Sequence, residues 1–204
     1  MTDQKQVMDE LRAGNRRFLD GQSAASPHLS LKKLKAFAEH GQLPKAIVLC
    51  CSDSRAPVEM IFDQDIGDLF VVRVAGNIVA PSLVGSVEFA TSKFGTQLVV
   101  VMGHSQCGAV TATLDHIEDP EATTSENIHD IVSRIEPHIF AIAKMPNLTR
   151  DEKVERAVEA NVRDSVMGLS AESPLLTQML REKKIVIVGA VLELATGEVK
   201  FLNA

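Results

Sequence analysis

Two aromatic residue types are missing from this chain, which contains no tryptophan and no tyrosine. No tyrosine phenol is therefore available as an acid, a base or a pocket donor. Cysteine is scarce too: there are three, and two of them, Cys50 and Cys51, are adjacent. Neighbouring cysteines do not easily form an ordinary disulfide with each other. A metal site or a catalytic thiol in a reducing compartment is therefore favoured over a disulfide framework.

Long hydrophobic runs are also absent. Every apolar run is well short of the ~18 residues that a transmembrane helix needs, and the first residues lack the apolar region of a secretory signal, so we expect a cytoplasmic protein. The 21 Lys and Arg against 27 Asp and Glu give a formal charge of -6. This balance argues mildly against nucleic acid or an anionic membrane as the partner. No phosphate-binding glycine loop is present, which fits a small-molecule substrate and no nucleotide.

The 204 residues are most simply one domain with a sizeable core. Amphipathic periodicity predicts helices over 3–19 and 31–41, which form an N-terminal helical arm (1–41) that either packs on its own core or lies across a neighbouring subunit. In the core (42–204), helical stretches separate β-branched runs that predict strands. These runs are 46–51, 69–74, 98–102, 185–192 and 199–202. The order predicts an α/β fold: a mainly parallel sheet flanked by helices, with an antiparallel C-terminal edge strand.

Three potential metal ligands lie where two of these strands end. Cys51 ends the first run, while His104 and Cys107 follow the third. In open parallel sheets, ligands bind beyond the carboxyl ends of the strands. Zinc accepts a set of two cysteines and one histidine, and catalytic sites keep a fourth position for water or substrate. A structural zinc, or a buried cysteine and a satisfied core histidine, remains the alternative at this point.

Asp53 and Arg55 follow Cys51 at two-residue steps. An arginine keeps a neighbouring carboxylate ionised and oriented, although an isolated pair of this kind is often only a surface ion pair. Two thiolates cancel the charge of zinc, so water bound there should be less acidic than in a three-histidine site, and deprotonation needs help. We expect Asp53 to accept that proton and Arg55 to hold Asp53 away from the metal. If Arg55 releases it, Asp53 becomes a fourth ligand. Activity should rise between about pH 7 and 9.

The segments Cys51-Ser-Asp-Ser-Arg55 and His104-Ser-Gln-Cys-Gly108 together resemble the paired signature of the β-class carbonic anhydrases. The similarity runs from about Gln42 to the end of the chain. It implies a zinc-dependent lyase in which a zinc-bound hydroxide hydrates carbon dioxide reversibly to bicarbonate and a proton. By this resemblance one Zn2+ per chain is bound by Cys51, His104 and Cys107, and Asp53 with Arg55 forms the catalytic dyad.

The resemblance also implies a carbon dioxide pocket. Gln42, Phe70 and Phe89 occupy the positions of the family's pocket residues, and Phe89 replaces a tyrosine there. Gly108 is placed to offer a backbone N–H to a substrate oxygen at a helix N-terminus, unless it simply permits close packing. Because the family builds its pocket at a subunit interface, we expect a homodimer or a homotetramer.

A second departure from the family concerns regulation. Some bacterial members hold an inhibitory bicarbonate with a Trp, Arg and Tyr set, and Val48, Arg73 and Leu192 stand at these positions here. Only the arginine is retained. We therefore predict no strong bicarbonate allostery of that kind.

Other functions use the same residues. A hydrolase of carbon disulfide or carbonyl sulfide would share the scaffold and the zinc ligands. A non-catalytic zinc-stabilised binding protein, or a thiol redox protein that uses Cys50 and Cys51, would need no substrate pocket. A cytidine-deaminase-type zinc site fits less well, because the chain has neither a His-x-Glu nor a Pro-Cys-x-x-Cys segment.

Overall fold

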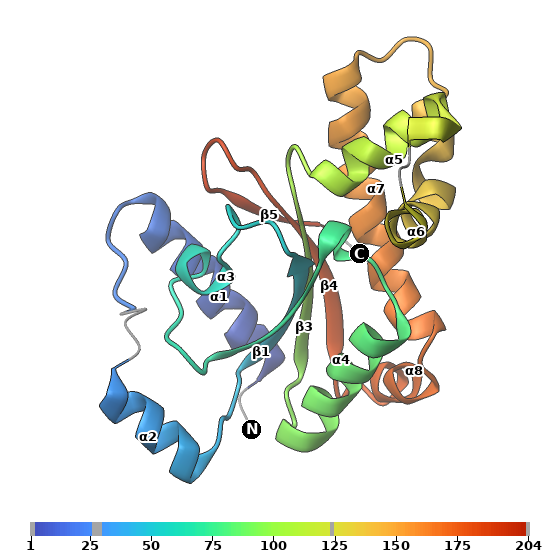
Figure 1. Cartoon of the computed structure of the whole chain (residues 1–204). Coiled ribbons are helices and arrows are strands. Elements are labelled where there is room, and N and C mark those ends of the chain that lie inside the picture. The colour runs from blue at the N-terminus through green and yellow to red at the C-terminus, as the bar shows by residue number, and fades with distance from the viewer. Residues whose placement is uncertain (1–2, 26–29, 123–124, 203–204) are drawn as a thin grey trace.

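The computed structural model describes residues 3–25, 30–122 and 125–202. Five strands form one sheet in the order β2-β1-β3-β4-β5 (Figure 1). The strands are β1 (Ala46–Cys51), β2 (Leu69–Val74), β3 (Leu98–His104), β4 (Val186–Leu192) and β5 (Val199–Phe201). Strands β1 to β4 are parallel to their neighbours, and β5 pairs antiparallel with β4. The predicted α/β class is therefore confirmed.

Both faces of the sheet are covered, which explains why the strands are continuous apolar runs. On one face, Val48 and Cys50 of β1 pack with α1 (Gln4–Leu19) and α3 (Val58–Ile61). On the other face, Ile47 and Leu49 pack with three further helices, and Figure 1 shows the two groups of helices on opposite sides of the sheet. These three helices are α4 (Pro81–Phe94), α7 (Arg150–Ala171) and α8 (Pro174–Arg181).

A third core lies beyond the carboxyl ends of the central strands. There α5 (Gly108–Glu118), α6 (Glu126–Ala143) and α7 enclose the side chains of Cys51 and Cys107. The described residues also include two short 3-10 turns, η1 (Ala75–Asn77) after β2 and η2 (Pro120–Ala122) after α5. Helix α6 runs beside both α5 and α7 (Figure 1).

Strand β3 is longer than its sequence pattern indicates. The pattern ends at Met102 because Gly103 interrupts the β-branched run, yet Gly103 and His104 pair with Val191 and Leu192 of β4. A Cβ atom on Gly103 would lie 2.6 Å from a methyl group of Val162 on α7. Glycine is present because α7 approaches the strand closely, and His104 belongs to the strand itself rather than to the turn.

The two helices of the N-terminal arm differ in their burial. Helix α1 packs on its own chain: Val7 is 2% and Leu11 is 0% exposed, and the side chain of Asn15 donates to the carbonyls of Ile61 and Gly197. Helix α2 (Leu31–His40) contains no buried residue. In the described part of the chain, no helix is long and apolar enough to cross a membrane.

Candidate metal centre

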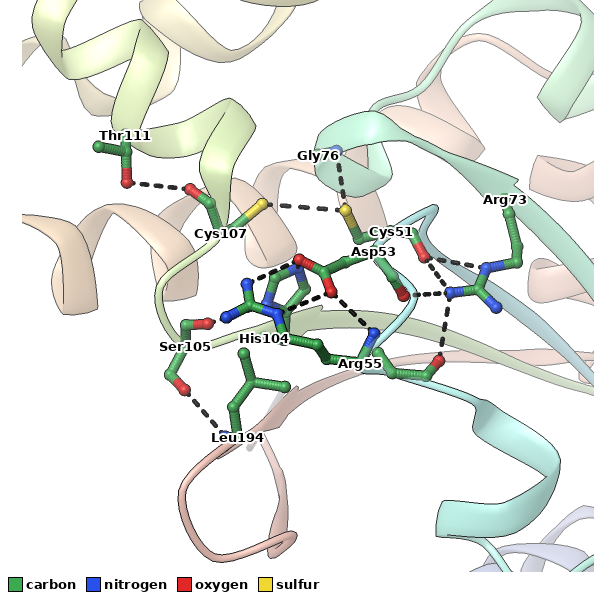
Figure 2. A network of polar contacts seen from close by, with 11 residues as sticks. Cys51, Asp53, Arg55, Arg73, Gly76, His104, Ser105, Cys107, Thr111 and Leu194 are labelled. Atoms are coloured by element: carbon green, nitrogen blue, oxygen red, sulfur yellow. Dashed lines mark hydrogen bonds and ion pairs between the residues drawn. The ribbon is translucent and has the colours of Figure 1, made fainter.

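The parallel pairing of β1 and β3 brings three potential ligands together. Cys51 is the last residue of β1, His104 is the last residue of β3, and Cys107 is the N-cap residue of α5. One ligand atom from each lies within 4.8 Å of the others, and all three residues are buried. We call these three residues the Cys2His group. Figure 2 shows their side chains converging between the strand ends and the start of α5.

The Cys2His group has the geometry that a zinc ion needs. The sulfurs of Cys51 and Cys107 are 4.0 Å apart, close to the ~3.8 Å expected for two thiolates on a tetrahedral zinc. The Nδ1 atom of His104 lies 2.8 Å from the carbonyl oxygen of Ser105, which leaves Nε2 as the metal-facing nitrogen. Nε2 is buried and makes no hydrogen bond within the described residues. A buried nitrogen without a partner is costly, and a metal ion at this point removes that cost.

The two adjacent cysteines have opposite environments. In the metal-free chain, a hydrogen bond with Cys107, supported by His104 and the Gly76 amide, lowers the pKa of Cys51 to about 4, although burial opposes this shift. The same shared hydrogen bond and burial raise the pKa of Cys107. Burial raises the pKa of Cys50 to about 12. Cys51 therefore lies with the other members of the Cys2His group, while Cys50 is a neutral core residue on the other face of β1.

A bidentate pair holds the carboxylate beside the Cys2His group. Arg55 donates from Nε to Oδ1 of Asp53 at 2.9 Å and from Nη2 to Oδ2 at 2.7 Å. The hydrogen bonds from Arg55 keep the pKa of Asp53 well below its usual range. Oδ2 of Asp53 also lies 3.8 Å from Nε2 of His104. The structure therefore places an ionised, arginine-held carboxylate next to the metal-facing side of the site.

Arg73 contributes a feature that the sequence pattern did not reveal. From the edge strand β2, its guanidinium donates to the backbone carbonyls of Cys51, Asp53 and Ala56 at 2.6–3.3 Å (Figure 2). These bonds fix the turn that carries both the first ligand and the carboxylate. The only signal in the sequence was a single charge inside an otherwise apolar strand.

Val48 and Leu192 are buried in the core, and the absence of bicarbonate allostery stays a prediction.

Gly108 begins α5 immediately after Cys107. A Cβ atom on Gly108 would meet no atom within 4 Å, so this glycine does not serve close packing within the chain. Its backbone N–H belongs to the first turn of the helix, where donors have no partner in the helix itself. An N-terminal amide beside the Cys2His group is suited to an anionic oxygen.

Gln42, Phe70 and Phe89 lie away from the Cys2His group of the same chain. In the sheet register, Phe70 is level with Ile47 and Val74 is level with Cys51, so Phe70 lies ~13 Å back along the strand. The rings of Phe70 and Phe89 are 6.4 Å apart. Gln42 precedes β1 and lines an open groove of about 520 Å³ together with Phe94 and Val71. These three residues, which the resemblance assigns to the substrate pocket and which are called the pocket residues below, therefore lie near the amino ends of β1 and β2.

Comparison with known proteins shows the family to which this chain belongs. The family model described as carbonic anhydrase matches residues 46–199. A carbonic anhydrase of Mycolicibacterium smegmatis is 36% identical over 190 residues, which cover 93% of this chain and 89% of that protein. The crystal structure of a β-carbonic anhydrase from Aspergillus fumigatus is 26% identical, with a TM-score of 0.72 over 84% of this chain and 81% of that one. Tetrameric β-carbonic anhydrases from Sordaria macrospora share the fold, with 21% identity and a TM-score of 0.73 over 97% and 98% of the two chains.

A mainly parallel α/β sheet that carries a Cys2His group at its strand ends fits the class of zinc enzymes. Within that class, the chain belongs to the β-carbonic anhydrase family. Zinc is the metal of this family, and the donor set of the described residues fits it.

Proposed function

We propose that this protein catalyses the reversible hydration of carbon dioxide to bicarbonate and a proton. The observation that carries the proposal is the buried Cys2His group with an arginine-held carboxylate beside it. Three protein ligands leave a fourth zinc position for water, which distinguishes a catalytic site from a closed structural one. The family match and the carbonic anhydrase from Mycolicibacterium smegmatis support this assignment.

Each group near the metal site has its own role. Zinc, when bound there, supplies a Lewis acid that makes water a nucleophile near neutral pH. Asp53, kept ionised by Arg55, would accept a hydrogen bond from water at the metal and pass its proton on to buffer. The backbone N–H of Gly108 stabilises the negative charge that develops on a carbon dioxide oxygen. The Ser105 carbonyl holds the His104 ring in its ligating orientation.

We further propose that a second copy of the chain completes the substrate pocket. The pocket residues are too far from their own Cys2His group to line it, and the surface near them is apolar. Leu43 is 82%, Leu31 78%, Phe89 53% and Leu34 50% exposed in the single chain. Covering such side chains is the main driving force of permanent homo-oligomers. A homodimer or a homotetramer would bring these residues toward the metal site of a neighbouring chain; the β-carbonic anhydrases of Sordaria macrospora are tetrameric.

The thiol chemistry supports a cytoplasmic location. Cys51 and Cys107 lie 4.0 Å apart, so an oxidant could join them and remove two ligands at once. A reducing compartment protects such a site, and the cytoplasm is therefore the proposed location.

The direct experiment combines a metal assay with a substrate assay. The purified chain should contain one zinc ion per chain and should hydrate carbon dioxide rapidly in a stopped-flow measurement. Removal of zinc with a chelator should abolish the activity, and added Zn2+ should restore it. A zinc-loaded chain that does not hydrate carbon dioxide, but hydrolyses carbonyl sulfide or carbon disulfide, would contradict the proposal.

A further inference from the structure

Asn161 is a buried polar residue on α7, and the metal chemistry described above does not use it. Its exposure is 2%, and it lies in the helix between the buried residues Val158 and Val162. A buried amide is costly unless it has a hydrogen-bond partner. Nδ2 of Asn161 donates to the carbonyl oxygen of Gly76 at 2.8 Å, across a separation of 85 residues.

Gly76 is in direct contact with the metal centre. Its backbone N–H donates to the sulfur of Cys51 at 3.4 Å (Figure 2). Gly76 therefore links the two residues. Its carbonyl accepts from the side chain of Asn161, and its N–H donates to the potential ligand Cys51.

The turn around Gly76 requires external support. Gly76 has φ +72° and the next residue, Asn77, has φ +45°, so two successive residues adopt the left-handed region. A Cβ atom on Gly76 would lie 2.8 Å from Ile135 and 3.0 Å from Ala109, which requires glycine at this position. A turn of this kind persists only where its surroundings hold it in place. The hydrogen bond from Asn161 is one such restraint, and it acts on the residue whose amide faces the ligand sulfur.

We propose that Asn161 is a positioning residue for the Cys51 ligand: by holding the Gly76 carbonyl, it aims the Gly76 N–H at the Cys51 sulfur. A hydrogen bond to a thiolate orients the sulfur and withdraws part of its negative charge. Outer partners of this kind set both the affinity of a metal site and the electron density that a ligand gives to the metal. This inference rests on the proposed function, because it requires zinc at the Cys2His group.

The test replaces Asn161 with a side chain of similar size that cannot donate. In Asn161→Leu, zinc should dissociate into a chelator about 10- to 100-fold faster than from the wild type. In the cobalt-substituted chain, the thiolate-to-cobalt absorption band should shift. In carbon dioxide hydration, kcat should fall while KM stays nearly constant, because the pocket residues are unchanged.

Asn15 provides a matched control. It is 5% exposed and its side chain also donates to backbone carbonyls, those of Ile61 and Gly197, but it lies on α1. Asn15→Leu should unfold at a lower temperature, yet should keep the zinc dissociation rate and the cobalt band of the wild type. If Asn161→Leu is destabilised to the same degree and also keeps both wild-type values, the inference is wrong.

A second variant covers the case in which Asn161→Leu does not fold. Asn161→Ser is small and polar, and its hydroxyl is too short to hold the Gly76 carbonyl, so the same faster release and shifted band are expected. Wild-type values in Asn161→Ser would refute the inference. Failure of the proposed function would be recognised separately, because the wild-type chain itself would then bind no zinc or hydrate no carbon dioxide.

Discussion

The two ends of the parallel sheet differ. At one end a single chain brings together a complete set of metal ligands, and at the other end it leaves apolar side chains exposed. At the carboxyl ends of β1 and β3, one chain supplies three buried ligands and a carboxylate that Arg55 holds in place. At the amino ends of β1 and β2, the chain exposes apolar side chains, among them Leu43 at 82% and Phe89 at 53%. The Cys2His group and the carboxylate are therefore preorganised within one chain, whereas we propose that assembly completes the walls around the substrate.

Loss of a ligand should have the largest effect. Cys107→Ala leaves two protein ligands, so zinc should be lost and hydration of carbon dioxide should fall to the uncatalysed rate. Cys50→Ala is the control: this thiol lies in the core on the other face of β1, so the variant should lose some stability but keep its zinc and activity. Metal content and stopped-flow rates measured on both variants test this. Zinc retained by Cys107→Ala would show that the ligand set is wrong.

Loss of the carboxylate should affect turnover without affecting metal content. Asp53→Asn should lower kcat by about 10²- to 10⁴-fold, the usual contribution of a positioned proton acceptor, while zinc stays bound. Asp130→Asn is the control, because Arg134 donates to Asp130 in a similar fork on α6, with both distances 3.2 Å. Its kcat should not change. Equal losses in the two variants would mean that Asp53 serves only the fold.

At the other end of the sheet, truncation of an exposed ring should affect catalysis. Phe89→Ala should lower kcat/KM roughly tenfold or more, which is the usual effect of missing apolar contacts in a pocket, and Phe89→Tyr should retain activity. Phe140 is 47% exposed on α6, so Phe140→Ala is a control of similar exposure. Phe140→Ala should change stability little. If neither changes kcat/KM, the pocket residues do not contact substrate.

Substitution of Asp63 should have the smallest effect on activity, because this residue lies at neither end of the parallel sheet. Its carboxylate is buried and accepts hydrogen bonds from the Ala24 and Ala25 amides and from Arg17. Burial opposes ionisation, but these bonds outweigh it and lower the pKa of Asp63. A lowered folded-state pKa stabilises the fold above the unfolded value of ~3.9 and loses that contribution as the pH falls below it.

Asp63→Asn should therefore lower the free energy of unfolding by about 1–3 kcal/mol at pH 7 and by less near pH 3. Its kcat should stay at the wild-type value. Urea unfolding at the two pH values checks the prediction. A destabilisation that grows as the pH falls would contradict the assigned sign.

The sequence predicts a helix or a strand correctly where a local pattern of residues determines it. The strands at 46–51 and 69–74 were correctly predicted, and parallel pairing then brings Cys51 and His104 together. The contacts that support the site were not predictable. The bonds from Arg73 to three carbonyls and from Asn161 to Gly76 join residues far apart in the sequence, and no local periodicity reports them.

The extension of β3 through Gly103 was missed for a related reason. A glycine in a strand pattern indicates an end or a bulge unless the helix that packs against it is known. The proximity of α7 to Gly103 becomes visible only in the folded chain.

We expect the metal of one chain to act with the pocket residues of another, and mixed dimers test this most directly. One parent, Cys107→Ala, keeps the pocket residues but lacks the metal. The other parent, Phe70→Ala combined with Phe89→Ala, keeps the metal but lacks the pocket walls. Two affinity tags allow the mixed dimer to be isolated. It should show about half of the wild-type activity, because one of its two sites is then intact in a two-fold arrangement. Activity no higher than the mean of the two parents would contradict the account.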